Sequence, residues 1–295
     1  MPGFLFLDLL MINYAQQLDT LIKNALAEDI GDGDHSTLCC IDGHAEGKAI
    51  LKIKEAGVLA GMEVAEQIFK YVQPTVQFKT FKKDGDQMQF GEIAFEVTAN
   101  IHTILKCERL VLNTMQRMSG IATLTKTYVD KLKGYKTRLL DTRKTTPNFR
   151  LLEKEAVRIG GGTNHRFGLY DMVMLKDNHI DYCGGIEKAI ENAYNYVQTV
   201  KPGLRIEVET RSLEDVIKVM ATGKVQVIML DNFTPVEIVA ALKIIDGQYE
   251  TEASGGINLQ NIESFAATGV DYVSSGAIIH QARSLDLSLK AKKAI

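Results

Sequence analysis

The second half of the chain alternates apolar, strand-like segments with amphipathic, helix-like ones, and this limits the fold more than any other feature. Six short apolar segments between residues 137 and 276 are separated by helical segments such as "GIEKAIENAYNYVQTV". This alternation is typical of a parallel sheet with helical crossovers. Six strands, with room for a seventh, fit a compact or incomplete α/β barrel or an open doubly wound sheet. The segments are "TRLLD", "DMVMLKD", "LRIEVET", "VQVIMLDN", "YETEAS" and "VDYVSSG".

The first part of the chain has a different pattern. Residues 46–98 contain the alternating runs "GKAILKIKEAG" and "GEIAFEVTA" on either side of the helix-like "GMEVAEQIFKYV". Such runs predict a small α+β layer with an antiparallel sheet. Residues 103–133 have helical spacing, with Ser119-Gly120 as the expected break. The whole chain is therefore predicted to be an α/β protein of two parts.

Length, charge and cysteine content exclude several classes of function. The 295 residues are enough for one large domain or two ordinary ones. With a net charge of −3 and no polybasic run, the chain offers no field for nucleic acid or for a membrane surface. The four cysteines form no CxxC pair, and the neighbours Cys39 and Cys40 are awkward to join. We therefore expect reduced thiols in a cytoplasmic protein, with no role assigned to the Cys39-Cys40 pair.

The apolar start of the chain is a poor candidate for a targeting or membrane segment. Residues 4–12 are apolar apart from Asp8, lack a basic flank, and are far fewer than a membrane span needs. A helical pattern that ends at a glycine begins naturally at Met11. Residues 1–10 are accordingly interpreted as an upstream extension.

All six strand-like segments of the second half end in polar residues. The carboxyl ends of parallel strands open on one face, where the sites of such folds lie, so we expect these residues to form one site. In chain order they are Thr142, Arg143 and Lys144; Lys176; Glu209; Asp231; Ser254, Gly255 and Gly256; and Ser275 and Gly276.

The residue types at these strand ends predict the chemistry of a ligand. Residues 138–179 are locally basic; arginine forks bind carboxylates, and lysines bind phosphates as point charges. The turns "SGG" and "SGA" each precede a helical segment and offer backbone amides to an anion. Glu209 and Asp231, the acids facing this basic rim, suit a divalent cation or sugar hydroxyls. Together they predict a ligand with carboxylates, a diphosphate, a monophosphate and a sugar.

Each of these residues also has a purely structural interpretation. Glu209 fits a surface charge, Asp231 a turn former, and Lys176 a solvated side chain. The "GGG" at 160–162 is not a dinucleotide fingerprint, because no GxGxxG spacing follows a strand. His179 is interpreted as orienting its loop and is left outside the site. Only the joint pattern favours a ligand site.

Longer motifs resemble one enzyme family. "DTRKTTPNFR", "EKEAVRIGGGTNHRFGLYDMVMLKDNHI", "EASGGIN" and "YVSSGAIIH", with "EDIGDGDHST" and "ERLVLNTMQRMSGIAT" earlier, closely resemble quinolinate phosphoribosyltransferases. The resemblance runs from about residue 14 to the end, in order and at similar spacing. It implies conversion of quinolinate and phosphoribosyl pyrophosphate, with Mg²⁺, into nicotinate mononucleotide, pyrophosphate and CO2 in de novo NAD synthesis.

The resemblance also implies an architecture. It predicts an N-terminal α/β sandwich domain, residues 1–118 joined by the tail 283–295, and an incomplete α/β barrel of the seven-stranded type, residues 119–282. It further implies a homodimer, or a higher oligomer of dimers, whose active sites contain residues of both subunits.

The roles that the resemblance implies extend the site to residues that the strand ends do not reveal. Quinolinate would be bound by Arg109 from the partner subunit and by Arg143, His165 and Arg166. Lys144 and Lys176 would lie near the ligand carboxylate and the pyrophosphate, and Thr142 would also bind substrate. Glu209 and Asp231 would meet the ribose hydroxyls and Mg²⁺, the metal mainly through the substrate. Lys144, Lys176, Glu209 and Asp231 would be catalytic. The 5′-phosphate would be held by Ser254, Gly255, Gly256, Ser275, Gly276 and His280.

Three other functions fit parts of the pattern. A Schiff-base lyase would use Lys176 as its amine, and borohydride trapping would reveal it. A sister phosphoribosyltransferase would act on nicotinate or a related acid, although the extra arginines favour a dicarboxylate. A non-catalytic sensor would bind phosphorylated ligands without releasing pyrophosphate.

Overall fold

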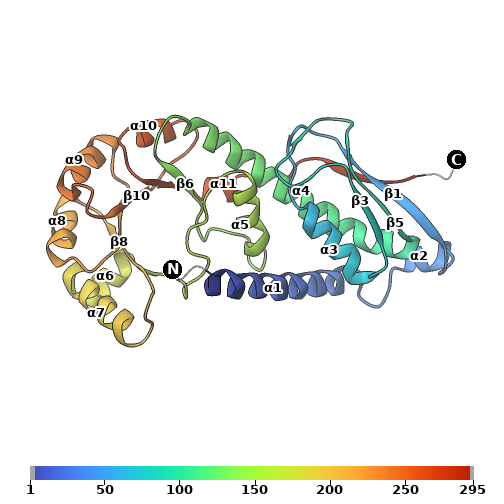
Figure 1. Cartoon of the computed structure of the whole chain (residues 1–295), viewed down its shortest axis with the longest axis horizontal. Helices are drawn as coiled ribbons and strands as arrows, with labels where there is room; N and C mark the ends of the chain where they lie inside the picture. The colour runs from blue at the N-terminus through green and yellow to red at the C-terminus, as the bar shows by residue number, and fades with distance from the viewer. Residues whose placement is uncertain (1–3, 293–295) are drawn as a thin grey trace. The chain divides into compact units, whose positions relative to one another are not determined.

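The computed structural model describes the backbone of residues 4–292 and the side chains of residues 14–292. The chain forms two compact units (Figure 1). The first contains the chain up to residue 124, residues 145–160 and the chain from residue 282; the second contains residues 125–144 and 161–281. Residues 145–160 and the chain from residue 282 both lie in the first unit. The domain boundaries given above stay a prediction.

The first unit contains a four-stranded antiparallel sheet in the order β12-β1-β5-β3. Helix α3 buries Val64, Ile68 and Phe69, and the rings of Phe69 and Phe95 meet edge to face at 6.2 Å. The alternating burial along β1 and β5 agrees with the period-2 pattern of their sequence. The elements are α1 (Phe4–Ile30), α2 (His35–Cys40), β1 (Glu46–Ile53), β2 (Gly57–Val58), α3 (Met62–Val72), β3 (Gln77–Thr80), β4 (Gln87–Met88), β5 (Ile93–Asn100), α5 (Arg150–Ile159) and β12 (Leu287–Ala291).

The break expected at Ser119-Gly120 is wrong, because α4 (Ile101–Lys131) runs through both residues. A β-carbon added at Gly120 would lie 1.9 Å from the carbonyl oxygen of Arg283. Ser119 Oγ accepts a hydrogen bond from the amide of Ala60 at 3.0 Å. These small residues therefore serve close packing inside the first unit and do not interrupt the helix.

The second unit is an incomplete α/β barrel, which confirms the fold class. All neighbouring strands are parallel, in the order β6-β11-β10-β9-β8-β7. The first and last strands of the unit pair, whereas β6 and β7 do not, so the ring stays open between them. At this edge Thr163 forms one isolated parallel bridge to Leu140, in place of a seventh strand. The strands are β6 (Arg138–Leu140), β7 (Val173–Leu175), β8 (Ile206–Thr210), β9 (Val227–Asp231), β10 (Glu250–Ser254) and β11 (Tyr272–Ser274).

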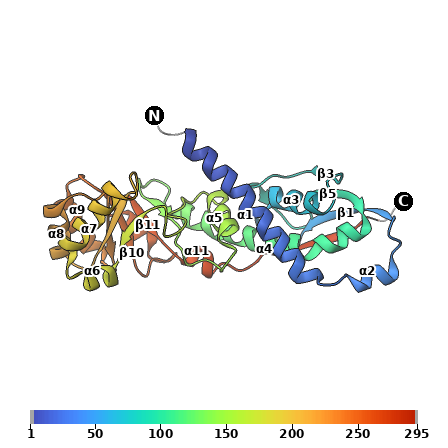
Figure 2. The same cartoon turned by 90° about the horizontal axis from the view of Figure 1, so that it is seen from below.

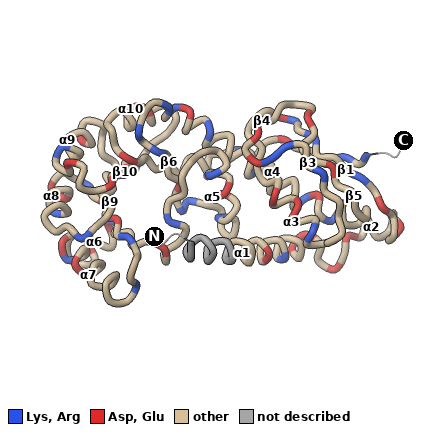
Figure 3. Tube along the Cα trace, in the orientation of Figure 1, with Lys and Arg blue, Asp and Glu red and all other residues tan. Residues whose placement is uncertain are grey.

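Amphipathic helices cover the outside of this sheet. Helices α7, α8 and α9 follow one another round the sheet in both views (Figures 1 and 2). Ser212 caps α8 by accepting from the amide of Asp215, and Thr234 and Glu237 form a capping box on α9. Charges of both signs are interspersed over these helices (Figure 3). The helices are α6 (Asp177–Cys183), α7 (Ile186–Thr199), α8 (Leu213–Thr222), α9 (Pro235–Ile245), α10 (Ile262–Ala266) and α11 (Ala277–His280).

Within residues 4–292, every helix is too short or too polar to cross a membrane. All four cysteines are free thiols, and the sulfurs of Cys39 and Cys40 lie 3.3 Å apart. The helix that the sequence predicts from Met11 is present as part of α1. In the structure α1 begins earlier, at Phe4. Residues 1–3 and the side chains of the predicted extension 1–10 lie outside what the structure describes.

Candidate active site

A cavity of about 900 Å³ lies at the carboxyl ends of the barrel strands, lined entirely by the second unit. Residues in register on neighbouring strands, among them Asp231 and Ser254, show that the lining side chains share the inner face of the sheet. Every predicted site residue except Arg109 lines it: Thr142, Arg143, Lys144, His165, Arg166, Lys176, Glu209, Asp231, Ser254, Gly255, Gly256, Ser275, Gly276 and His280. The expected convergence of the strand ends is therefore present.

Arg109 lies elsewhere in the chain. It is on α4 within the first unit, its side chain is 63% exposed, and its nearest acid is its neighbour Glu108 at 3.7 Å. The resemblance places Arg109 in the partner subunit's site, so its part in catalysis stays a prediction.

Two acids form one wall of the cavity. Glu209, at the end of β8, is 8% exposed; its Oε2 lies 3.1 Å from Nζ of Lys176, and its Oε1 accepts from the amide of Asp177 at 3.4 Å. Asp231, at the end of β9, accepts from Ser254 Oγ and Asn232 Nδ2, both at 2.6 Å. Each carboxylate is thus held in one orientation, as a group that stabilises developing positive charge must be.

The interpretation of His179 agrees with its geometry. His179 is not among the lining residues, and its Nδ1 accepts the backbone amide of Lys176 at 3.0 Å. This bond caps α6 and fixes the backbone from which the Lys176 side chain extends.

Cations also line the cavity, among them Arg143, Lys144 and Arg166. Burial lowers the pKa of Arg166, and the nearby positive charge of Arg143 lowers it further. Nη1 of Arg166 donates to the carbonyl of Met172 at 3.4 Å. In the described part of the chain neither Arg166 nor Lys144 has a carboxylate at ion-pair distance. An anion placed here would relieve the repulsion between the cations and be held by their charge.

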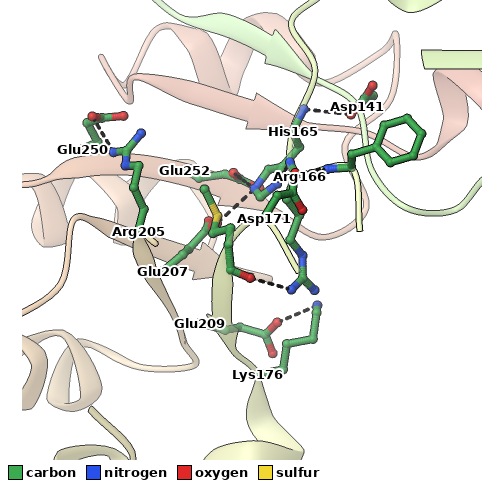
Figure 4. A network of polar contacts seen from close by, with 12 residues as sticks. Asp141, His165, Arg166, Asp171, Lys176, Arg205, Glu207, Glu209, Glu250 and Glu252 are labelled. Atoms are coloured by element: carbon green, nitrogen blue, oxygen red, sulfur yellow. Dashed lines mark hydrogen bonds and ion pairs between the residues drawn. The ribbon is translucent and has the colours of Figure 1, made fainter. Parts of the chain in front are cut away.

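The side chain of His165 is 8% exposed and meets two acids that sequence reasoning did not include (Figure 4). Its Nε2 lies 3.0 Å from Oε2 of Glu207 and 3.1 Å from Oε2 of Glu252. Burial disfavours a charged ring, whereas the two carboxylates favour a proton on Nε2, and Nδ1 carries none because it accepts the backbone amide of Arg166 at 2.6 Å. Burial and the neighbouring Glu252 raise the pKa of Glu207 to about 7.

Two aspartates shape the segment that carries His165 and Arg166. The fully buried Asp141 accepts the amide of His165 at 2.9 Å and the side-chain amide of Asn164 at 2.6 Å. Asp171 accepts the amides of Phe167 and Gly168 at 2.6 and 2.9 Å. The carboxylate that follows the apolar "LL" of the chain is thus a loop anchor beside the site.

The glycine turns at the ends of β10 and β11 form the remaining wall. Gly255 has a φ of +92°, and a β-carbon there would lie 2.2 Å from Oδ1 of Asn232, so this turn requires glycine. A β-carbon at Gly276 would meet the Lys144 and His280 side chains at 2.9 and 3.2 Å, which places both beside this turn.

The two turns are tied together by buried hydroxyls. Ser275 Oγ donates to the carbonyl of Ile257 at 2.8 Å. The Tyr128 hydroxyl is hydrogen-bonded to the Ser275 side chain and to the backbone of Leu259. Tyr128 comes from the last part of α4 and is 3% exposed, so it supports both turns from below.

The donor set fits a magnesium ion bound partly by substrate better than one enclosed by protein. Glu209 and Asp231 supply the oxygen ligands that Mg²⁺ prefers, but all four of their oxygens already accept hydrogen bonds. Within residues 14–292 the one cluster of three metal-ligating side chains is His165, Glu207 and Glu252, which does not contain them. A site made of two carboxylates and substrate phosphates is the usual arrangement for Mg²⁺.

Two of the site residues that sequence reasoning missed, Glu207 and Glu252, share one sequence signal. Glu207 and Glu252 stand two positions before the rim residues Glu209 and Ser254, so they face the same side of their strands. An acid inside a strand that is buried on both faces is unusual and needs a partner. Tyr128 had no comparable signal, because a tyrosine within a helix is common in a core.

Comparisons with known proteins agree with this geometry. Residues 34–119 match the family model described as quinolinate phosphoribosyl transferase, N-terminal domain, and residues 121–290 match the C-terminal domain of the same family. The chloroplastic nicotinate-nucleotide pyrophosphorylase (carboxylating) of Arabidopsis thaliana is 43% identical over 288 residues, which cover 92% of this chain and 82% of that protein. The probable nicotinate-nucleotide pyrophosphorylase (carboxylating) of Bacillus subtilis is 42% identical over 273 residues, covering 92% of this chain and 93% of that protein.

A solved structure shows the same fold at similar identity. The crystal structure of NadC from Streptococcus pyogenes has a TM-score of 0.87 and 43% identity, and the match covers 94% of this chain and 98% of that one. Both halves of the chain match the family, and the resemblance of its motifs is confirmed. The chain belongs to the quinolinate phosphoribosyltransferase family.

Proposed function

We propose that this protein is a decarboxylating quinolinate phosphoribosyltransferase, a pentosyltransferase of NAD biosynthesis. Its substrates are quinolinate and phosphoribosyl pyrophosphate, and its products are nicotinate mononucleotide, pyrophosphate and CO2. The observation that carries the proposal is the single cavity in which a cationic wall, an acidic wall and two glycine turns meet. The cations match a dicarboxylate, the acids match a ribose, and the glycine turns match phosphates.

The cationic wall binds the dicarboxylate. Arg143 and Arg166 offer planar guanidinium groups to two carboxylates, and Lys144 lies beside the phosphate turn at Gly276. Loss of water from these cations on binding strengthens each ion pair. Because both carboxylates are held, the pyridine nitrogen is aligned with the sugar.

In the first step the pyridine nitrogen forms a bond to the anomeric carbon as the bond to pyrophosphate breaks. Positive charge develops on the ribose ring, and the fixed carboxylates of Glu209 and Asp231 stabilise it. Lys144 and Lys176 balance the negative charge of the leaving group. No side chain has to act as a nucleophile, and orientation alone can supply roughly 7–11 kcal/mol.

In the second step the carbon–carbon bond to the carboxylate next to the ring nitrogen breaks and CO2 leaves. The electron pair stays on the ring carbon, where the adjacent nitrogen cation stabilises it, and that carbon then takes up a proton. The product is nicotinate mononucleotide.

Mg²⁺ is proposed as the metal, held by Glu209 and Asp231 mainly through the substrate. When bound, it neutralises negative charge on the diphosphate. The donor set described above supports this assignment, and a requirement for Mg²⁺ in the assay tests it.

A cytoplasmic homodimer, or a higher oligomer of dimers, with shared sites is proposed as the working form. The exposed guanidinium of Arg109, which has no described role within its own subunit, supports a role in a partner. Arg109→Ala protein mixed with Lys176→Ala protein should recover activity, because one hybrid site is intact. Verified heterodimers without recovery would contradict shared sites.

The rival functions find less support. A Schiff-base lyase would attack its substrate with Nζ of Lys176, yet this atom already donates a hydrogen bond to Glu209 at 3.1 Å. The two arginines favour a dicarboxylate over nicotinate, and an assay with both acids tests this.

The deciding experiment measures release of both pyrophosphate and CO2 from quinolinate, phosphoribosyl pyrophosphate and Mg²⁺. Equal release of the two products supports the proposal. Pyrophosphate without CO2 would indicate a sister phosphoribosyltransferase, and binding without either product a sensor.

A further inference from the structure

Two buried glutamates, one of which lines the cavity, face one imidazole. Glu207 in β8 and Glu252 in β10 have side chains only 1% and 2% exposed, and both point at Nε2 of His165 (Figure 4). Burial raises the pKa of Glu207 and the charge of Glu252 raises it further, so the two carboxyls lie near one another. Among residues 14–292, His165 is the one basic side chain at ion-pair distance from them.

This placement is costly on two counts. A buried carboxylate loses several kcal/mol of hydration unless it is paired. Negative charge on these acids also opposes the binding of a dicarboxylate in the cavity by Coulomb repulsion. Acids at these positions therefore need a compensating role.

The contacts of the imidazole indicate that role. While Nε2 faces the two carboxyls, Nδ1 accepts the backbone amide of Arg166 at 2.6 Å. Both ring nitrogens are thus engaged by the protein, and the ring connects the interior of the sheet to the backbone of Arg166. A proton added at Nδ1 would replace this bond by a repulsive contact between two N–H groups.

The segment around Arg166 depends on such contacts. Residues 164–172 contain no helix or strand, so side chains fix the path of the backbone. Asp141 and Asp171 hold it on either side of Arg166, at the amides of His165 and Phe167. The imidazole holds the amide of Arg166 itself.

We propose that Glu207 and Glu252 are positioning residues for quinolinate: they orient the His165 ring, which fixes the backbone that carries the Arg166 guanidinium. The inference rests on the proposed function, since it names the residues that set affinity for the dicarboxylate. It adds two acids that do not touch substrate to the machinery of the site.

The direction in which KM for quinolinate changes in Glu252→Gln distinguishes a positioning role from a simple effect of charge. Glu252→Gln keeps the size of the side chain and removes its charge. Less repulsion alone would lower KM for quinolinate, whereas loss of positioning raises it, by about 10-fold on the scale of other supporting-shell substitutions. KM for phosphoribosyl pyrophosphate should stay within about two-fold, because the phosphate turns do not contact Glu252.

Glu250→Gln is the matched control. Glu250 lies on the same strand, is paired with Arg205 at 2.6 Å, and is 43% exposed. The Glu250→Gln substitution should leave KM for quinolinate and KM for phosphoribosyl pyrophosphate unchanged. Glu207→Gln serves as the second test variant, and a loss of folded protein in either variant would lower kcat without raising KM.

A readout without substrate completes the test. In protein labelled with ¹⁵N-arginine, the amide resonance of Arg166 should shift in Glu252→Gln and stay in place in Glu250→Gln. An unmoved resonance, or a quinolinate KM that is unchanged or lower, overturns the proposal. Failure of the wild-type protein to release CO2 and pyrophosphate would overturn the proposed function instead, and the Arg166 resonance would still decide the positioning role.

Discussion

The barrel has a hollow at each end of its sheet, and only one of them has the properties of a site. The cavity at the amino ends of the strands, about 710 Å³, is comparable to the 900 Å³ cavity at the carboxyl ends. Both contain lysines, arginines and acids. Size and polarity therefore do not distinguish them.

The pairing of charges does distinguish them. At the amino ends Arg205 pairs with Glu250 at 2.6 Å and Lys136 with Asp271 at 3.0 Å. Burial would raise the pKa of Asp271, but hydrogen bonds from Thr251 and Lys136 lower it. The charges at this end satisfy one another.

At the carboxyl ends the acids are used differently. Asp141 accepts loop amides, Asp231 accepts a hydroxyl and an amide, and Glu252 faces an imidazole. Lys144 and Arg166 thus keep their charge for a ligand. In the binding site, acids near these cations accept hydrogen bonds from other groups. In the cavity at the amino ends, the acids pair with the cations themselves.

The largest expected contrast concerns the acids of the two ends. Glu209→Ala should lower kcat by about 100- to 1000-fold, the usual cost of removing one preorganised electrostatic group. Glu250→Ala breaks a half-exposed ion pair worth at most about 1 kcal/mol and should leave kcat within two-fold. Steady-state rates and circular dichroism of both variants make the comparison, and similar losses in both would contradict it.

The arginines of the two ends should differ next. Arg143→Ala should raise KM for quinolinate by about 100-fold, as expected for a desolvated charge pair, and affect phosphoribosyl pyrophosphate less. Arg205→Ala should change neither value. Equal loss of affinity for both substrates in Arg143→Ala would refute its assignment to the dicarboxylate.

A glycine at each end gives a smaller contrast. Gly255→Ala drives a methyl group into Asn232 and should raise KM for phosphoribosyl pyrophosphate by about 10-fold. Gly247 lines the other cavity, also has positive φ, and has open space around it. Gly247→Ala should cost only about 1 kcal/mol of stability and spare both KM values. Affinity measured for each variant at saturating quinolinate tests this.

The smallest effect concerns pH. Because burial and the neighbouring Glu252 raise the pKa of Glu207 from 4.5 to about 7, the stabilising contribution of its protonated form is complete below pH 4.5 and is lost as the pH rises to 7. Glu252→Gln removes part of that shift, so its melting temperature should fall less over this range, by a few °C at about 2–4 °C per kcal/mol. Glu250→Gln should follow the wild type, and parallel curves for all three proteins would contradict the coupling.

The sequence predicted the rim of the barrel because strand ends converge by geometry alone. Lys176, Glu209 and Asp231 needed no contact information, only the parallel order of the strands. Glu207 and Glu252 were missed because their partner, the imidazole of His165, lies on a loop far from both strands in the sequence. The wrong break at Gly120 has a related cause, since the carbonyl of Arg283 that demands glycine comes from 163 residues later in the chain. Arg109 has no local signal at all and came only from family resemblance.

The path of the chain through the first sheet has a consequence for biosynthesis. Strand β12 pairs with β1 through residues 287–291, although the whole barrel is translated between them. On the ribosome one edge of β1 in the N-terminal sheet must stay unpaired until β12 has been translated. Nascent chains stalled before residue 287 should therefore expose that edge to chaperones or to other chains, even when the barrel has already emerged.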